Sequence, residues 1–215
     1  HIHFTTNKIA RERLVQMGEN PSNIYVIGSP EIDVLLSKKL PTLNKVKKYY
    51  QINYSNYGLF IYHPVTSELK DIRNNIKSVI DSIIDSELNY VIIYPNNDTG
   101  SDIIFNELNR LKNSKKFRML PSMRFEYYIT LMKNANFIIG NSSSGVREAP
   151  VFGVPTINIG TRQMHRNKSK SILNVNEEKN KITDAINNLP RKVKPTYEFG
   201  YGNSAEKFIQ KLNSS

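Results

Sequence analysis

The segment with the clearest chemical potential is 140–148, which reads Gly-Asn-Ser-Ser-Ser-Gly-Val-Arg-Glu. It follows an apolar run at 137–139 and leads into a helix-like stretch, so we expect a strand, a polar turn and a helix start. Such a turn offers free backbone N–H groups, hydroxyls and the positive end of a helix dipole, which together suit a phosphate group. Glu148 lies about one turn into the expected helix, where it can accept hydrogen bonds from a ribose diol. These residue types predict a nucleotide-diphosphate site.

The three serines of this turn have two interpretations. The hydroxyls of Ser142 and Ser143 can bind phosphate oxygens directly. Helix capping by Ser143 or Ser144 is an alternative, and it is compatible with ligand binding because both use the same N–H groups. The chain has no cysteine, and the alternating pair His1 and His3 lacks a third ligand. We therefore expect neither a metal site nor a cofactor.

Two basic side chains follow other apolar runs. His63 comes directly after residues 59–62, where an imidazole can donate to a phosphate oxygen or move a proton near neutral pH. A packed or solvated histidine is the alternative, but a position at the end of a strand favours a functional role. Arg162 offers a planar guanidinium suited to a diphosphate or a carboxylate, with an ordinary surface arginine as the alternative. We expect both residues in the site.

The carboxylates are few where a sugar would lie. Asn96 and Asp98 can read sugar hydroxyls, or can cap the helix expected from Ser101, which is a common use of aspartate. An enzyme that makes and breaks C–H bonds of a sugar without a metal needs two or more carboxylates. The loops at the strand ends supply Asp98 and Glu148, and Glu148 is already assigned to a ribose. The acid–base groups are therefore expected outside this chain.

The elements that must position these residues follow from the hydrophobic pattern. From Phe60 onward apolar runs alternate with helical patterns, which is the signature of a parallel sheet covered by helices. We expect strands at 59–62, 90–94, 117–120, 137–139 and 156–159, and helices at 67–86, 101–112, 125–134 and 145–152. Ligands bind beyond the carboxyl ends of the strands in such sheets. The loops after these five strands should therefore converge on one edge of a doubly wound α/β domain.

The two ends of the chain have a different texture. A strand at 2–5, a helix at 7–17 and a strand at 24–27 form either the sheet's own first unit or the end of a preceding domain. A charged segment at 38–48 is a second weak boundary. Two further helices are expected at 182–189 and 204–212.

Length and charge restrict the class of protein. The 215 residues suffice for one large domain, or for one domain and part of another. No stretch approaches the roughly 18 apolar residues of a membrane span or resembles a signal peptide, so we expect a soluble, cytoplasmic protein. The net charge of +11 invites a nucleic-acid interpretation, but the basic residues are spread along the chain without a recognition signature. We expect an acidic small molecule such as a sugar nucleotide, and neither nucleic acid nor membrane, as the partner.

Four motifs in order carry a family resemblance. They are His-Pro-Val-Thr at 63–66, Pro-Asn-Asn-Asp-Thr-Gly-Ser at 95–101, the turn at 140–148 and Gly-Thr-Arg-Gln at 160–163. With Met-Gly-Glu-Asn-Pro at 17–21 and Tyr-Gly-Asn at 201–203, they make the chain resemble the C-terminal half of the hydrolysing UDP-N-acetylglucosamine 2-epimerases, which open sialic acid synthesis. Non-hydrolysing relatives usually carry Asp-Ser-Gly-Gly at the turn, so Asn-Ser-Ser-Ser at 141–144 favours the hydrolysing branch.

The resemblance implies an architecture and a set of contacts. The family has two Rossmann-like domains in the GT-B arrangement, so residues 1–30 would end the preceding domain and 31–215 would form the UDP-binding domain. His63 would be catalytic and contact the UDP-sugar. Ser142 and Ser143 would bind the diphosphate and Glu148 the ribose. The other UDP contacts would come from Asn96, from Arg162, from the loop at Ser122 beside the uracil, and from the nearby aromatic residue Tyr128.

The resemblance also implies a reaction. UDP would leave UDP-N-acetylglucosamine by anti elimination, and water addition would then release N-acetylmannosamine. Proton removal at C2 would fall to carboxylates upstream of His1, so we expect this chain alone to be inactive, with a missing N-terminal domain and further copies of itself as partners. A UDP-diacetamidobacillosamine 2-epimerase or a retaining GT-B glycosyltransferase is an alternative. A non-catalytic, basic nucleotide- or nucleic-acid-binding module is an alternative of a different class.

Overall fold

The computed structural model describes residues 1–190 and 193–213, and its backbone contacts divide the chain into two compact units. One unit combines His1–Leu40 with Tyr197–Ser215, and the other is Pro41–Thr196. The sequence-based boundary after residue 30 lies ten residues earlier and leaves the C-terminal helix in the second domain. The assignment of residues 1–30 to a preceding domain stays a prediction.

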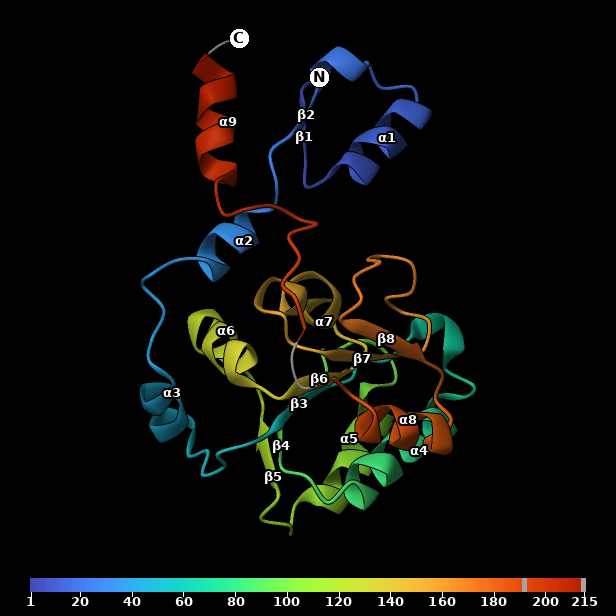
Figure 1. Cartoon of the computed structure of the whole chain (residues 1–215). Coiled ribbons are helices and arrows are strands. Elements are labelled where there is room, and N and C mark those ends of the chain that lie inside the picture. The colour runs from blue at the N-terminus through green and yellow to red at the C-terminus, as the bar shows by residue number, and fades with distance from the viewer. Residues whose placement is uncertain (191–192, 214–215) are drawn as a thin grey trace. The chain divides into compact units, whose positions relative to one another are not determined.

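The larger unit is built on one parallel sheet of six strands (Figure 1). The order across the sheet is β5-β4-β3-β6-β7-β8. The strands are β3 (Gly58–Ile61), β4 (Tyr90–Ile93), β5 (Phe117–Leu120), β6 (Phe137–Gly140), β7 (Thr156–Ile159) and β8 (Ile172–Val175). From β3 the chain winds outward through β4 to β5 and then returns to β6 on the other side of β3. The order therefore reverses between β3 and β6, which is where open α/β sheets bind ligands.

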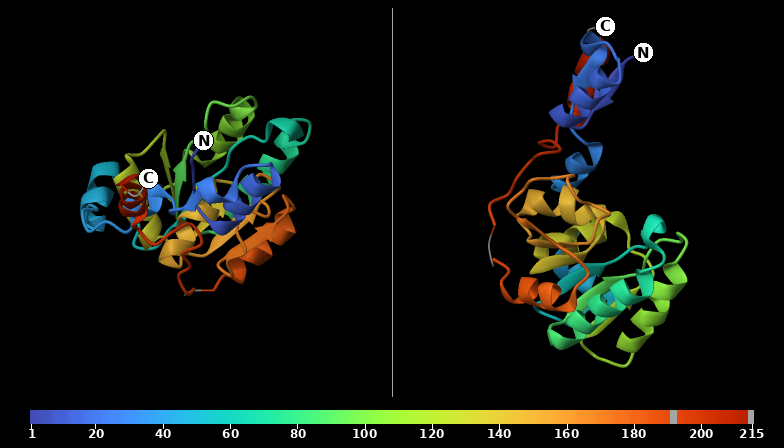
Figure 2. Two further views of the ribbon diagram at one scale, coloured as in Figure 1. Left: turned by 90° about the horizontal axis from the view of Figure 1, so that it is seen from above. Right: turned by 90° about the vertical axis from the view of Figure 1, so that its right-hand side faces the viewer.

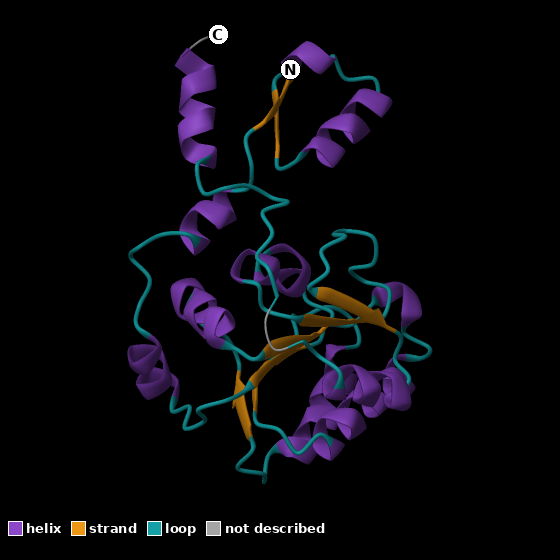
Figure 3. Ribbon diagram, in the orientation of Figure 1, coloured by secondary structure: helices purple, strands orange, loops and turns teal. Residues whose placement is uncertain are grey.

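Helices cover both faces of this sheet (Figure 2, Figure 3). On one face lie α4 (Ile72–Asp85), α5 (Ser101–Leu108) and α8 (Lys179–Asn187), and on the other lie α3 (Leu43–Tyr50), α6 (Phe125–Asn134) and α7 (Ser143–Arg147). Short 3₁₀ turns, η2 (Thr66–Glu68), η3 (Asn109–Leu111) and η4 (Ala149–Phe152), join these elements. Burial on both faces explains why the central strands are continuous apolar runs rather than alternating ones.

Helix α4 shows how the sequence specifies this packing. It buries Ile72, Ile76, Val79, Ile80 and Ile83, which recur at intervals of three and four residues and so form one stripe along the helix. The stripe packs in the same core as the strand residues Phe60 and Tyr90. Their neighbours Leu59 and Val91 point to the opposite core, as the two-residue period of a strand requires.

Gly140 is required where β3 and β6 meet. Its φ of +128° lies in the region that favours glycine, and a Cβ at this position would lie 2.0 Å from the carbonyl oxygen of Ile61. The same carbonyl accepts the N–H of Asn141 at 3.1 Å. This close approach brings the two loops at the switch point together.

The smaller unit holds a two-stranded parallel sheet of β1 (His3–Thr5) and β2 (Ile24–Val26). With it lie α1 (Lys8–Gln16), η1 (Pro21–Asn23), α2 (Pro30–Leu35) and α9 (Ser204–Asn213). Asp33 ties α2 to the start of α9, because its carboxylate accepts the backbone N–H groups of Ser204 and Ala205, both at 3.0 Å. Strands β1 and β2 pair only with each other among the described strands, so they are not the first unit of the six-stranded sheet.

The sequence-based elements are largely confirmed, with four corrections. The five predicted strands of the large sheet are present to within a residue at each end, but β8 was not predicted. Helices α2 and α3 were also not predicted. The expected helix at 67–86 is a 3₁₀ turn followed by α4, which begins at Ile72. The predicted helix at 145–152 begins earlier and is likewise two short pieces, α7 and η4.

No helix within residues 1–190 and 193–213 is long and apolar enough to cross a membrane.

Candidate functional site

A cleft of about 420 Å³ lies at the carboxyl ends of the strands around the switch point. Loops after β3, β4, β5 and β6 all contribute to it, because the register pairs Ile61 with Ile93 and with Gly140, and Ile93 with Leu120. Five predicted site residues line the cleft: His63, Asn96, Ser122, Tyr128 and Ser142. Four of the five predicted loops thus line the cleft. The fifth, after β7, does not line it, but its Arg162 contacts Asn141 in the loop after β6.

His63 is held by its backbone and by its ring. Asn141, which is 1% exposed, accepts the backbone N–H of His63 through Oδ1 at 2.7 Å and donates from Nδ2 to the carbonyl of His63 at 2.8 Å. The backbone N–H of Asn96 donates to Nδ1 of the His63 ring at 3.1 Å. An accepting Nδ1 carries no proton, so the neutral ring has its proton on Nε2 and can donate it to a ligand.

The environment keeps this imidazole neutral. Burial, together with the nearby guanidinium of Arg162, lowers the pKa of His63 from 6.5 to about 4. Removing a cation from water disfavours its charged form, and a second cation nearby disfavours it further. At neutral pH His63 is therefore a hydrogen-bond donor without charge, and its contribution to anion binding is directional.

Arg162 supplies the positive charge at this edge. It follows β7, and its Nη1 donates to the carbonyl oxygen of Asn141 at 3.0 Å. Burial, and then the neighbouring Arg166, lower the pKa of the Arg162 guanidinium. Across residues 1–190 and 193–213 no carboxylate forms an ion pair with Arg162. Its remaining N–H donors can therefore bind an anionic ligand.

The serine turn differs in detail from the prediction. Ser142, and not Ser143 or Ser144, caps α7, because its side chain accepts the N–H of Ser144. The hydroxyl of Ser144 contacts those of Ser142 at 3.1 Å and Tyr128 at 2.5 Å, and Ser144 lines the cleft. Ser143 is not among the residues lining the cleft. Ser144, to which the sequence analysis gave only a capping role, therefore belongs to the wall of the site.

The loop after β4 also corrects an expectation. The side chain of Asp98 does not cap α5, whose N-cap is Gly100; it accepts a hydrogen bond from the side chain of Asn96. Both residues are exposed, and so is Ser122 at the far end of the cleft. These three polar groups remain accessible to a ligand.

Glu148 lies at the C-terminal end of α7 and is 8% exposed. Burial, and then the charge of Glu148, raise the pKa of the Tyr128 hydroxyl, while a hydrogen bond with Ser144 opposes this. Glu148 therefore lies near Tyr128, although it is not among the residues lining the cleft.

Two carboxylates at this sheet edge escaped the sequence analysis. Glu68 ends η2 in the loop after β3, and its Oε1 accepts the hydroxyl of Thr161 at 2.5 Å. Glu177 follows β8 and accepts the hydroxyl of Tyr62 at 3.3 Å, while burial raises its pKa. The count of Asp98 and Glu148 alone was therefore wrong. Glu177 was missed because β8 was not predicted, so no rule placed the loop after it at this edge.

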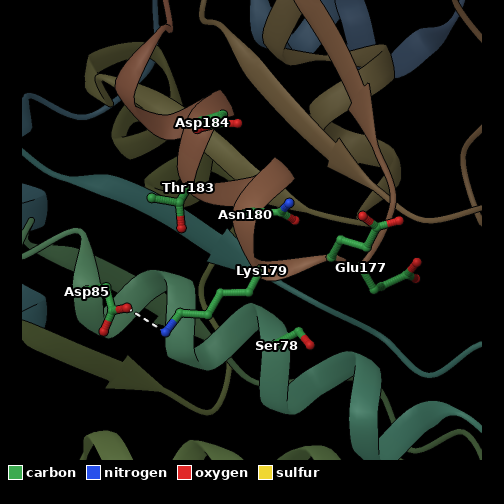
Figure 4. Close-up of a pocket in the computed structure, with 8 residues that line it drawn as sticks. Ser78, Asp85, Glu177, Lys179, Asn180, Thr183 and Asp184 are labelled. Carbon is green, nitrogen blue, oxygen red and sulfur yellow. Dashed lines mark ion pairs between the residues drawn. The ribbon is translucent and has the colours of Figure 1, made fainter.

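A larger depression of about 720 Å³ lies between α4 and α8 (Figure 4). Four carboxylates and one lysine line it, and the lysine, Lys179, pairs with Asp85 at 2.6 Å. The excess of negative charge opposes a phosphate ligand. The cleft at the switch point therefore has the better chemistry for a nucleotide.

Comparison with known proteins gives a consistent family. A family model described as UDP-N-acetylglucosamine 2-epimerase matches residues 1–213. A UDP-N-acetylglucosamine 2-epimerase of Neisseria meningitidis serogroup B is 47% identical over 186 residues, which make up 86% of this chain and 49% of that protein. The polysialic acid biosynthesis protein P7 of Escherichia coli is 35% identical over 188 residues, 86% of this chain and 48% of that protein. The chain thus spans about half the length of these curated relatives.

Solved structures show the same fold. The crystal structure of UDP-GlcNAc 2-epimerase from Neisseria meningitidis bound to UDP-GlcNAc matches with a TM-score of 0.81 at 17% identity, covering 100% of this chain and 62% of that chain. This likeness confirms the Rossmann-like fold of the GT-B type expected from the sequence.

Proposed function

The chain belongs to the UDP-N-acetylglucosamine 2-epimerase family, and on this premise we propose that its switch-point cleft binds the UDP portion of a UDP-sugar. The observation that carries the proposal is the meeting of three donors at one point. The neutral ring of His63, the cation of Arg162 and the Ser142 turn are linked through a single buried residue, Asn141.

Each group has a distinct task in this proposal. Arg162 binds the diphosphate through its free N–H donors, and Ser142 and Ser143 offer their hydroxyls to the phosphate oxygens. Asn96 also holds the nucleotide, Glu148 takes the ribose hydroxyls, and the uracil lies toward Ser122 and Tyr128. Because α7 has only five residues, the side chains rather than a helix dipole supply most of the attraction.

The same contacts assist departure of UDP. When the bond between the sugar and the diphosphate breaks, negative charge grows on the leaving phosphate oxygen. Arg162 stabilises that charge, and Nε2–H of His63 can donate to the oxygen as a catalytic residue. Preorganised donors in a partly buried cleft lower the barrier without having to reorient during the reaction.

We further propose that the whole enzyme releases N-acetylmannosamine and UDP from UDP-N-acetylglucosamine and water. The Asn-Ser-Ser-Ser turn at 141–144 supports the hydrolysing branch. The name of the Escherichia coli relative supports a role in sialic acid synthesis. The groups that move protons at the sugar would belong to a second Rossmann-like domain, since the curated relatives are about twice as long as this chain.

Calorimetry with UDP tests the binding site. The chain should bind UDP, and Glu148→Ala should weaken binding by about tenfold because a carboxylate that accepts ribose hydroxyls contributes roughly 1.5 kcal/mol. Asp184→Ala, which removes a carboxylate from the α4–α8 groove, is the matched control. Absence of UDP binding by the wild-type chain would refute the site assignment.

Product analysis tests the reaction. We expect no turnover of UDP-N-acetylglucosamine by the 215-residue chain, and free N-acetylmannosamine from the chain joined to a complete N-terminal domain. Release of a 2-epimerised diacetamido sugar instead would select the bacillosamine alternative. A requirement for an acceptor would select a glycosyltransferase.

A further inference from the structure

Hydrogen bonds and two short stretches of backbone form a closed set of contacts among the loops after β3, β6 and β7. It begins at Glu68, whose Oε1 accepts the hydroxyl of Thr161 at 2.5 Å across 93 residues of sequence. Glu68 is partly buried, and its backbone is fixed by hydrogen bonds from its N–H to Val65 and to its carbonyl from the N–H of Asp71. The backbone from which this side chain reaches Thr161 is therefore held in place, although Thr161 itself is exposed.

The set of contacts continues through the proposed ligand-binding groups. Thr161 is followed directly by Arg162, whose guanidinium donates to the carbonyl of Asn141. The side chain of Asn141 holds the backbone of His63, and His63 and Glu68 belong to the same loop. Thr161 and Asn141 are thus the two links between the β3 loop and the arginine.

The contact with Thr161 holds the start of the β7 loop, which runs on to β8. The loop opens at Gly160 with φ of +71°, and His165, midway along it, has φ of +62°, so its backbone departs from regular structure at both points. A long arginine side chain loses about 2 kcal/mol of rotamer entropy when it is fixed in one geometry. Contacts that hold the backbone in advance reduce the part of this loss that falls on binding.

The position of Glu68 also has an electrostatic cost. Burial is the main cause that raises the pKa of Tyr62 and of Glu177. The charge of Glu68 raises both pKa values further, so its carboxylate lies close enough to Glu177 to repel it. A residue that served only to fill space or to solvate the surface would gain from losing this charge. The hydrogen bond from the hydroxyl of Thr161 is the side-chain contact that offsets this repulsion.

We propose that Glu68 is a positioning residue for diphosphate binding: through Thr161 it fixes the backbone of Arg162, so that the guanidinium faces the leaving phosphate beside His63. The inference rests on the proposed UDP site. It assigns a role to a carboxylate that touches neither the nucleotide nor the sugar. Because Glu68 acts through Arg162, its effect must vanish when the arginine is absent.

The test is UDP calorimetry on the 215-residue chain with a set of single and double variants. Glu68→Ala and Thr161→Val should each weaken UDP binding by about fivefold, which corresponds to one lost hydrogen bond of ordinary strength. Glu68→Gln keeps an accepting oxygen for the threonine hydroxyl and should bind within about twofold of wild type. Glu107→Ala, which removes a carboxylate paired with Arg110 at 2.9 Å on α5, is the matched control.

The decisive comparison is the Glu68→Ala change in the Arg162→Ala background. There it should produce no further loss of affinity. An undiminished effect in that background, or Glu68→Ala binding like wild type while Arg162→Ala is impaired, overturns the inference and leaves the UDP site intact. Failure of the wild-type chain itself to bind UDP overturns the proposed function, and the inference with it. Thr161→Val keeps the question answerable should the Glu68 variants fail to fold.

Discussion

Because His63 is neutral in the folded chain, we expect the free energy of unfolding to fall in acid by a definite amount. Because its pKa is 6.5 in the unfolded chain and about 4 in the folded one, the unfolded chain takes up a proton first as the pH falls. Protonation of the unfolded chain therefore lowers the free energy of unfolding as the pH falls below 6.5, and this loss reaches its full size below pH 4. Proton linkage gives a loss from this one group of about 2 kcal/mol at pH 5 relative to pH 8.

The substitution His63→Asn isolates the contribution of this histidine to the pH dependence of stability. An asparagine oxygen can accept the N–H of Asn96 in place of Nδ1, but it does not titrate. Urea unfolding of both proteins at pH 8 and pH 5 measures the effect. The stability of wild type relative to the variant should fall by about 2 kcal/mol on acidification. His165→Asn, which removes an exposed imidazole, controls for the loss of a histidine. Parallel pH profiles for wild type and His63→Asn would refute the buried, neutral imidazole.

Three substitutions probe the scaffold of the site. Gly140→Ala places a methyl group 2.0 Å from the carbonyl oxygen of Ile61 and should cost more than about 3 kcal/mol of unfolding free energy in urea; a wild-type midpoint would contradict the close approach. Asn141→Ala deletes both hydrogen bonds to the backbone of His63 and should lower stability by about 2 kcal/mol and weaken UDP binding in calorimetry; unchanged affinity would show that His63 is held otherwise. Tyr128→Phe removes a hydroxyl bonded to the serine turn and should cost about 1 kcal/mol in thermal unfolding, and no change would mean that the contact is dispensable.

The central strands β3, β4, β6 and β7 could be predicted because they are buried on both faces. Each reads as a short apolar run bounded by polar turns, and the helices between them carry apolar stripes. Strand β8 could not be found this way. It is an edge strand of four residues, Leu173 and Asn174 are exposed, and the polar Asn174 interrupts the apolar pattern.

The location of the candidate cleft was predicted from the rule that ligands bind beyond the carboxyl ends of parallel strands. Contacts that depend on strand pairing or on the exact start of a helix were not predicted. Asn141 belongs to the predicted turn at 140–148. Its hydrogen bonds to the backbone of His63 depend on the pairing of β3 with β6, which a sequence pattern does not contain. Glu68 lies in the predicted helix at 67–86, where a glutamate is typical of a solvated face. Its contact with Thr161 exists only because the chain turns as η2 before α4 begins.

Helix α3 was not predicted, although its sequence contains a helix-capping residue and an apolar position. Thr42 caps it by accepting the N–H of Lys45, and Val46 is fully buried beneath three exposed or half-exposed lysines. A charged stretch with one apolar face is amphipathic rather than a boundary, so the capping threonine could have identified it.

A crystal structure of this chain with UDP tests the central claim most directly. We expect the diphosphate between Arg162 and the Ser142 turn, within hydrogen-bond distance of Nε2 of His63, and the ribose toward Glu148. UDP bound in the α4–α8 groove, or at the cleft with its diphosphate away from Arg162, would contradict it.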